Sequence, residues 1–282
     1  MRLATRLAMA GALAGALSAG RAVAQDEVPF ITTPDRVTVA MLELAGVGAR
    51  DHVLDLGSGD GRIVITAARR FGASGLGVEI VPELVRKSRE HARAAGVEGR
   101  VEFREQDLFA TDLARATVVT MYLLPEVNLQ LRPRLLQLAP GTRIVSHDWD
   151  MGEWQPDRTL TLDVPDKAIG REKKSDVHLW VVPARVHGTW CAADARLEVT
   201  QRFQRFSATL LPRGAGAAAA PVVVFDGRIE GDQLRTEAVL TTAARLRYQS
   251  RSAGDLLEVL QISGPASAFA GRAFVRAAGA AC

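Results

Sequence analysis

The stretch "VLDLGSGDGRIVITAARR", which runs from Val53 to Arg70, decides the fold class of this chain. An apolar run ends at the acidic residue Asp55, glycines follow at positions 57, 59 and 61, and apolar residues then recur at helical spacing. This order predicts a buried strand, a glycine-rich corner and an amphipathic helix. In open α/β sheets such corners bind ligands, because glycine lets the backbone approach the ligand closely.

The same alternation of strands and helices continues along the chain. Apolar, β-branched strands separated by helices predict a parallel sheet that is covered on both faces. A further helix precedes the first strand, with Thr33 as its N-cap and Gly46 at its end. The expected strands are 52–56, 75–80, 101–104, 117–123 and 143–147, and the expected helices that follow the first, second and fourth of them are 61–71, 82–95 and 125–138.

Beyond residue 150 the pattern changes. Two strands, 158–164 and 177–183, have no helix between them and should form an antiparallel pair at the sheet edge. The lysine-rich linker between them is expected to be a solvated loop. From about residue 187 short β-type runs with Gly-Asp turns predict a small antiparallel barrel or sandwich. The expected fold class is therefore α/β, a doubly wound, seven-stranded, mostly parallel Rossmann-like sheet with a second, all-β domain.

The first residues have the three parts of a secretory leader. Arg2 and Arg6 precede an apolar stretch of small residues, and an A-x-A cleavage site follows at 22–24. The stretch is short for a membrane span, so we expect an exported protein, periplasmic or secreted, without a stable span in its mature form. An alanine-rich N-terminus of a cytosolic protein is the alternative. The predicted division is leader 1–24, cofactor-binding domain 28–185 and β domain 188–282.

The charge of the chain depends on that leader. The full chain carries 35 Lys+Arg against 32 Asp+Glu, and the leader contains three arginines and no acid, so the mature counts are 32 and 32. The basic pI therefore does not indicate a nucleic-acid partner, and none is expected. Cys191 and Cys282 are not spaced for a metal site, and no metal is expected. In an exported protein they could form a disulfide; a buried Cys191 beside a free Cys282 is the alternative.

The corner favours a particular ligand. The spacing G-x-G-x-G differs from the G-x-G-x-x-G of dinucleotide sites, and Asp55 would repel a pyrophosphate but suits an ammonium group. Glu79 closes the second strand, where a ribose-binding acid is expected. Asp107 follows the third strand and could accept a hydrogen bond from an exocyclic amine. Three acids at successive strand ends indicate a cation that carries a nucleoside and no phosphates.

The motifs "DLGSGDGR", "GVEI" and "EQDLF" resemble those of class I S-adenosylmethionine-dependent methyltransferases. More narrowly, "TPDRV", "YLLPE" and "LRPRLL…PGTRIVSHDW" are similar to protein-lysine methyltransferases, the group that includes mitochondrial enzymes acting on the adenine nucleotide translocase and on the c-type subunit of ATP synthase. The resemblance covers roughly residues 28–183. It implies S-adenosylmethionine as the cofactor and a protein lysine as the methyl acceptor.

The resemblance also implies roles for individual residues. Asp55 and the 57–59 backbone would hold the methionine end of the cofactor, Glu79 the ribose and Asp107 the adenine amine. The implied cofactor-binding set is Thr33, Pro34, Asp55, Gly57, Ser58, Gly59, Glu79, Asp107 and Leu108. Tyr122 and Glu126, at the end of the fourth strand, would face the acceptor, although Glu126 also fits a helix-start acid that the helix dipole stabilises.

The sequence leaves two other functions open. One is an exported binding protein that keeps a nucleoside pocket without activity. The other is an NAD-dependent oxidoreductase, which the glycine spacing and Asp55 disfavour. Methyl transfer from a sulfonium needs positioning and desolvation more than an acid–base pair, so the lack of an obvious catalytic dyad does not exclude an enzyme.

Overall fold

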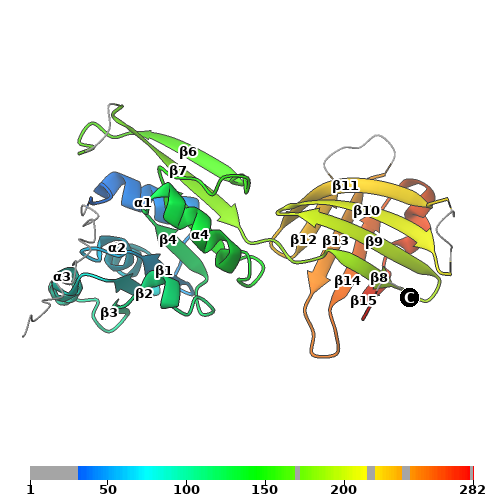
Figure 1. Cartoon of the computed structure of the whole chain (residues 1–282), viewed down its shortest axis with the longest axis horizontal. Helices are drawn as coiled ribbons and strands as arrows, with labels where there is room; N and C mark the ends of the chain where they lie inside the picture. The colour runs from blue at the N-terminus through cyan, green and yellow to red at the C-terminus, as the bar shows by residue number, and fades with distance from the viewer. Residues whose placement is uncertain (1–30, 169–171, 215–219, 237–241, 280–281) are drawn as a thin grey trace, which may run out of the picture. The chain divides into compact units, whose positions relative to one another are not determined.

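The computed structural model of the chain describes residues 31–168, 172–214, 220–236, 242–279 and 282 (Figure 1). The leader expected at 1–24 lies outside these residues and stays a prediction. None of the helices in the described ranges is long and apolar enough to cross a membrane.

The first half of the described chain forms a seven-stranded sheet of order β3-β2-β1-β4-β5-β7-β6. β1 to β5 run parallel, whereas β7 pairs antiparallel with both β5 and β6. The strands are β1 (His52–Leu56), β2 (Ser74–Glu79), β3 (Val101–Glu105), β4 (Val118–Met121), β5 (Arg143–His147), β6 (Arg158–Asp163) and β7 (Lys174–Val181). Because β1 lies between β2 and β4, the strand order reverses beside β1, and the glycine corner opens at that switch point.

Helices cover both faces of the sheet, as Figure 1 shows. The helices are α1 (Asp35–Leu44), α2 (Arg62–Phe71), α3 (Pro82–Ala94) and α4 (Pro125–Leu135), with a short 3₁₀ turn η1 (Leu108–Ala110). Successive strand residues point to opposite faces, so Val53 packs with α1 and α2 while Leu54 packs with α4. The predicted strands and helices are confirmed to within a few residues at their ends.

The prediction of a solvated linker before the last sheet strand is wrong in part. β7 begins at Lys174, inside the expected loop, and Ser175 is buried. The side chain of Lys167 is only 15% exposed because it forms an ion pair. Sequence polarity suggested solvent here, whereas the antiparallel pairing of β7 with β5 draws part of this segment into the sheet.

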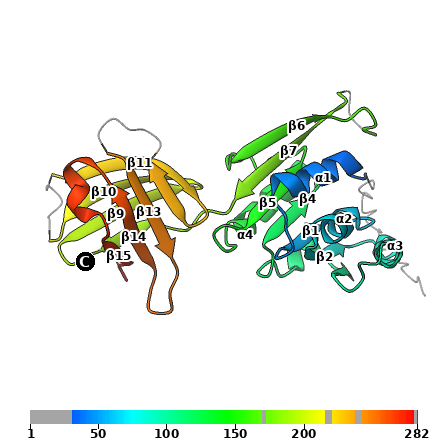
Figure 2. The same ribbon diagram turned by 180° about the vertical axis from the view of Figure 1, so that it is seen from behind.

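The second half forms a closed antiparallel barrel of order β10-β11-β12-β13-β14-β15-β8-β9, seen from behind in Figure 2. Its side chains alternate between interior and surface, and the interior is filled by Trp190, Phe206, Phe225, Phe274 and aliphatic residues. The elements are β8 (Gly188–Cys191), β9 (Ala195–Arg202), β10 (Arg205–Pro212), β11 (Val223–Glu230), β12 (Gln233–Thr236), β13 (Ala244–Gln249), β14 (Leu256–Ile262), η2 (Gly264–Phe269) and β15 (Ala273–Arg276). The predicted small β domain is therefore a barrel.

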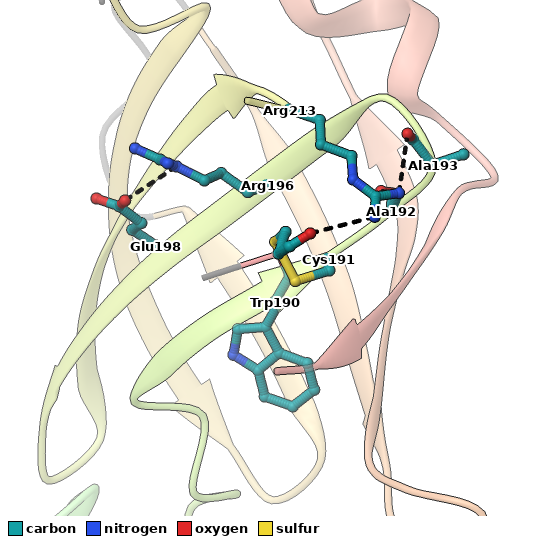
Figure 3. The surroundings of a disulfide bond; sticks show 8 residues. Trp190, Cys191, Ala192, Ala193, Arg196, Glu198 and Arg213 are labelled. Atoms are coloured by element: carbon teal, nitrogen blue, oxygen red, sulfur yellow. Dashed lines mark hydrogen bonds and ion pairs between the residues drawn. A yellow bond between two sulfur atoms is a disulfide. The ribbon is translucent and has the colours of Figure 1, made fainter. Parts of the chain in front are cut away.

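A disulfide between Cys191 and Cys282 ties the C-terminus to the barrel (Figure 3). The two Cα atoms are 5.6 Å apart, within the range that a disulfide spans. Cys191 lies in β8, which pairs with β15 through few residues. Arg213 donates to the carbonyl oxygen of Cys282 at 3.1 Å and to that of Ala193 at 3.2 Å. The bridge thus reinforces the barrel at the short pairing of β8 with β15, which we call the seam.

Candidate active site

The glycine corner after β1 has a backbone that side chains would not tolerate. Gly57, Gly59 and Gly61 have φ values of 75°, 53° and 82°, in the left-handed region that favours glycine. A Cβ atom added at Gly57 would also come within 2.9 Å of the Leu123 side chain. The amides of Gly57 and Ser58 donate to the carbonyl oxygen of Val78, each at 2.9 Å, and so fix the corner against the end of β2.

Asp55 places a carboxyl group in the interior beneath this corner. It is 2% exposed, and Thr120 Oγ1 donates to its Oδ1 at 2.7 Å. Burial raises the pKa of Asp55 to about 7, the hydrogen bond from Thr120 acts in the opposite direction, and the charges of Glu79 and Asp60 add to the rise. A buried carboxyl poised near neutrality at a strand end is typical of a ligand site, and a cationic ligand would favour its ionised form.

Glu79 ends β2 with a carboxylate that the backbone already orients. Its Oε2 accepts from the Gly59 amide at 3.0 Å, and its Oε1 accepts from the amides of Ile80 at 2.8 Å and Val81 at 3.0 Å. A carboxylate has about four lone-pair positions and these amides take three, so one position on Oε2 remains for a hydroxyl, and a second hydroxyl would replace one of the backbone hydrogen bonds. The geometry therefore presents a fixed acceptor at the place where the sequence predicts ribose binding.

Asp107 and Leu108 follow β3 at the same edge of the sheet. Asp107 Oδ1 accepts from the Phe109 amide at 2.8 Å and caps η1, while the carboxylate stays exposed. Two large apolar side chains are exposed beside these acids: Ile80 at 66% and Phe109 at 40%. Sequence reasoning missed both, although each directly follows a predicted ligand-facing strand end. Exposed apolar side chains at this edge suit contact with a flat ring.

A cofactor that carries a nucleoside and a positive charge fits this set of residues. The buried Ser58 Oγ has no hydrogen-bond partner among the described residues, and a buried hydroxyl without a partner costs free energy. A ligand in the cradle could supply the missing partner. The other residues of the set offer three carboxylates at three strand ends and an amide-lined corner, which suit a cation better than a phosphate.

Tyr122, the residue that the sequence predicts to face the acceptor, packs on His147, which the sequence analysis did not place in the site. The buried His147 ring lies 4.0 Å from the Tyr122 ring, centroid to centroid. Its Nδ1 hydrogen-bonds with Thr33 Oγ1 at 3.2 Å, and its Nε2 hydrogen-bonds with Ser175 Oγ at 2.9 Å. The N-terminal segment, β4, β5 and β7 therefore meet at one imidazole.

The prediction of Thr33 as a helix N-cap is wrong. α1 begins at Asp35 with Pro34 as its N-cap, and no side chain caps it. The Thr33 hydroxyl instead contacts His147, because the segment before α1 lies over the end of β5. Arg62 of α2 donates to the carbonyl oxygen of Thr33 at 3.0 Å and holds the same segment from the cofactor side. The cofactor-binding role of Thr33 and Pro34 stays a prediction.

Neither Tyr122 nor His147 is poised to exchange protons near neutral pH. Burial lowers the pKa of His147 to about 4, the charge of Asp148 partly opposes this, and Lys167 adds to the lowering. Burial and the charge of Asp148 raise the pKa of Tyr122. The imidazole is therefore neutral and the phenol protonated, and both groups are weak general bases. Because both ring nitrogens of the buried His147 are already hydrogen-bonded, only the half-buried Tyr122 is available to contact an acceptor.

Glu126 is the predicted site residue least supported by the geometry. It lies exposed in the first turn of α4, and its side chain makes none of the hydrogen bonds that tie the Tyr122–His147 group together. A carboxylate in the first turn of a helix is also favoured by the helix dipole. Its catalytic role stays a prediction.

Comparisons with known proteins identify relatives of the first half of the chain. The family model of the ANTKMT methyltransferase domain matches residues 55–158. A protein-lysine N-methyltransferase of Saccharolobus islandicus is 44% identical over 138 residues, which are 48% of this chain and 86% of that enzyme. The adenine nucleotide translocase lysine N-methyltransferase of Mus musculus is 34% identical over 131 residues, 46% of this chain and 57% of that enzyme.

A solved methyltransferase structure is also similar to about half of this chain. It is an RNA methyltransferase from Salinibacter ruber in complex with S-adenosyl-L-homocysteine, and it is 53% identical with a TM-score of 0.50. It matches 55% of this chain and 96% of its own. The matches therefore cover about half of this chain. They cover nearly the whole of the Saccharolobus and Salinibacter relatives, whereas the chain spans about half the length of the mouse enzyme.

Proposed function

The chain belongs to the ANTKMT-type family of S-adenosylmethionine-dependent methyltransferases, and we propose that it transfers the methyl group to the ε-amine of a lysine in a protein. The observation that carries the lysine acceptor is the 44% identity to a protein-lysine N-methyltransferase of which this chain covers 86%. The half-buried Tyr122 ring, which packs on the buried and neutral His147, supports it, since an aromatic ring can contact an aliphatic amine without giving it a proton.

Several residues of this chain would hold the cofactor. Asp55 and the 57–59 backbone would take its charged methionine end, Glu79 its ribose and Asp107 its adenine amine. When bound, the cofactor supplies a sulfonium methyl: the acceptor lone pair forms the new N–C bond as the S–C bond breaks, and sulfur keeps that electron pair. The part of the protein is to orient the amine in line with this bond and to exclude water.

Before it reacts, an acceptor lysine must lose a proton to solvent. His147 and Tyr122 are poor bases at neutral pH, so we expect the rate to rise with pH as more of the acceptor becomes neutral. Binding the amine between Tyr122 and the segment at Thr33 would also desolvate it, which favours its neutral form.

RNA methylation is the second candidate, because the Salinibacter relative is described as an RNA methyltransferase. The test is transfer of labelled methyl from S-adenosylmethionine to an extract of the native host, followed by protease or ribonuclease treatment. Label that protease releases as methyl-lysine supports the proposal. Label that ribonuclease alone releases would replace it with RNA methylation, and no transfer with intact cofactor binding would overturn both.

We also propose that the chain is exported, with residues 1–24 as its leader. The disulfide between Cys191 and Cys282 supports this, since such bridges persist in oxidising compartments and are rare in the cytosol. Peptide mapping without reduction, on protein from the native host, tests it together with the mature N-terminus. Two free thiols and an intact leader would contradict export.

Residues 28–185 would act as the catalytic domain and 188–282 as an accessory β domain. About half of this chain matches nearly the whole Salinibacter chain, which supports a catalytic part that folds by itself. A chain that ends at residue 187 should therefore bind S-adenosylmethionine as the full chain does. A folded fragment that cannot bind the cofactor would show that the division is wrong.

A further inference from the structure

One lysine of this chain lies inside the site rather than in solvent. Lys167 Nζ is 2.8 Å from Asp148 Oδ2 and donates to the carbonyl oxygen of Lys174 at 2.6 Å. Its side chain is 15% exposed, whereas the other three lysines, Lys87, Lys173 and Lys174, are exposed. Lysine is rarely buried unless its charge is paired, so the ion pair with Asp148 accounts for the burial of the Lys167 side chain.

Asp148 has an unusual backbone that aims this carboxylate. Its φ is 61°, which is uncommon for a residue other than glycine. Residues with such backbone conformations cluster at functional sites. Two hydrogen bonds to Asp176 hold it there: the Asp148 amide donates to the Asp176 carbonyl oxygen at 2.7 Å, and the Asp176 amide donates to Asp148 Oδ1 at 3.1 Å. Oδ1 is thus occupied by the backbone, and Oδ2 is left to bind a cation.

The carboxylate lies at the acceptor side of the site. Asp148 Oδ2 is 3.5 Å from His147 Nε2, and the His147 ring contacts Tyr122. The chain neighbours of Lys167 also line an open pocket of about 270 Å³, whose lining residues are Thr32, Pro34, Asp35, Arg36, Arg62, Asp166 and Ala168. The residues on either side of Lys167 therefore line a space that also borders the N-terminal segment.

We propose that Asp148 Oδ2 binds the ε-ammonium group of the acceptor lysine before that group loses its proton and reacts, and that Lys167 occupies this site until the acceptor displaces it. This inference rests on the proposed lysine acceptor and names the residue that recognises it. The ammonium of Lys167 has the chemistry of the acceptor and is held beside the rings of Tyr122 and His147. An acceptor then binds by exchange of one ammonium for another.

The other explanation is a structural ion pair that fixes the β6–β7 connection. The two explanations differ in what happens when the lysine is removed. If the pair is only structural, its removal leaves an unpaired carboxylate in the cavity of the lost side chain, which also binds small amines, but the KM for a protein acceptor does not change. An acceptor site without its internal competitor binds amines more tightly and also lowers that KM.

The experiment is calorimetric titration of n-butylamine, which reproduces the lysine side chain from Cβ to Nζ, into the full chain saturated with S-adenosyl-L-homocysteine at neutral pH. Lys167→Ala should bind the amine roughly tenfold or more tightly than the wild type, because an intramolecular competitor has a high effective concentration. Lys167→Ala with Asp148→Asn should lose this gain. Lys174→Ala is the matched control, because only the main-chain carbonyl of Lys174 contacts Lys167.

Lys167→Met keeps most of the length of the side chain and serves if the alanine variant does not fold. Unchanged butylamine affinity in a folded Lys167 variant that still binds S-adenosyl-L-homocysteine would overturn the inference. A gain in amine affinity without methylation of any protein lysine would support the ammonium site and overturn the proposed function. Protein-lysine methylation whose KM for the acceptor does not change in the Lys167 or Asp148 variants would uphold the function and overturn the inference.

Discussion

At the scale of single residues, the site depends on carboxylates whose environments differ. Asp55 is buried and has a raised pKa, whereas Glu79 is orientated by three backbone amides and Asp107 is exposed. Asp55 is suited to ionise when a cation binds beside it, and Glu79 to hold a pair of hydroxyls in a fixed position. Asp107 is suited to accept a hydrogen bond from an amine at the surface. Three identical functional groups thus have three different tasks because of burial and hydrogen bonding.

Asp55 should make both stability and cofactor binding depend on pH. Its folded-state pKa of about 7 lies above its ordinary value of 3.8, so the folded protein binds the extra proton between these pH values. Stability from this group is therefore full below about pH 4 and is lost as pH rises toward 7, by about 4 kcal/mol at most. Thermal melts of the cofactor-free protein at several pH values, against Asp55→Asn, measure the difference.

The same residue should release a proton when the cofactor binds, because a cation favours the ionised carboxylate. Calorimetry near pH 6 in buffers of different ionisation enthalpy would detect the release. The Asp55→Asn variant is the control and should show less release. Equal proton release from both proteins would contradict the assignment.

Glu79→Ala should weaken S-adenosylmethionine binding while the protein stays folded. Loss of charge-assisted hydrogen bonds to a hydroxyl pair costs roughly 2–4 kcal/mol, or tens- to several-hundred-fold in affinity. Glu83→Ala, which removes an exposed carboxylate at the start of α3, is the matched control and should bind normally. If Glu79→Ala retains wild-type affinity in calorimetry, the ribose role of this residue is wrong.

At the scale of elements, the N-terminal segment is fixed to the sheet through one side chain. Thr33 hydrogen-bonds with His147, which also reaches Ser175 on β7, so the segment before α1 is tied to two strands. This arrangement holds the segment at Pro34 without a helix cap. The segment and the Tyr122–His147 group therefore depend on each other.

Thr33→Val keeps the shape of the side chain and removes this bond. It should lower the free energy of unfolding by about 1–3 kcal/mol, since a buried imidazole nitrogen loses its partner. Thr32→Val, at the neighbouring half-buried position, should have a smaller effect. A double-mutant cycle of Thr33→Val with His147→Phe, measured by urea unfolding, should show coupling of roughly 0.5 kcal/mol or more. Additive effects would mean that the bond does not link the two elements.

At the scale of the whole molecule, the hydrogen-bonded barrel carries a covalent link between residues 91 apart in sequence. Strand β15 meets β8 through only a short register. The disulfide therefore protects the weakest seam of the barrel, while the cofactor cradle lies in the sheet.

Cys191→Ser with Cys282→Ser should lower the unfolding free energy of the barrel by about 4–5 kcal/mol in the chain-entropy model, less any strain in the native bridge. Denaturant unfolding followed by tryptophan fluorescence measures this. The wild type with a reductant should approach the double variant, and the reductant should leave the variant unchanged. S-adenosylmethionine affinity should be the same in all samples. Equal unfolding midpoints would show that the bridge does not stabilise the barrel.

The sequence by itself determined the features that depend on local order. Strand, glycine corner and helix follow from the periodicity of neighbouring residues, and the acids at 55, 79 and 107 stand at strand ends that can be located without knowing the fold in detail. Because parallel strands end at one edge of a sheet, their convergence was predictable too. The barrel was predictable only as a small β domain, since short strands do not specify closure.

Only the tertiary structure decided the contacts between distant residues. Thr33 and His147 are 114 positions apart, and the bond between them replaced the expected helix cap. Lys167 and Asp148 meet because β7 inserts beside β5, which the polar linker did not indicate. No local pattern encodes which hydroxyl reaches an imidazole or which lysine reaches a carboxylate, because these pairings arise from the packing of elements that are remote in sequence.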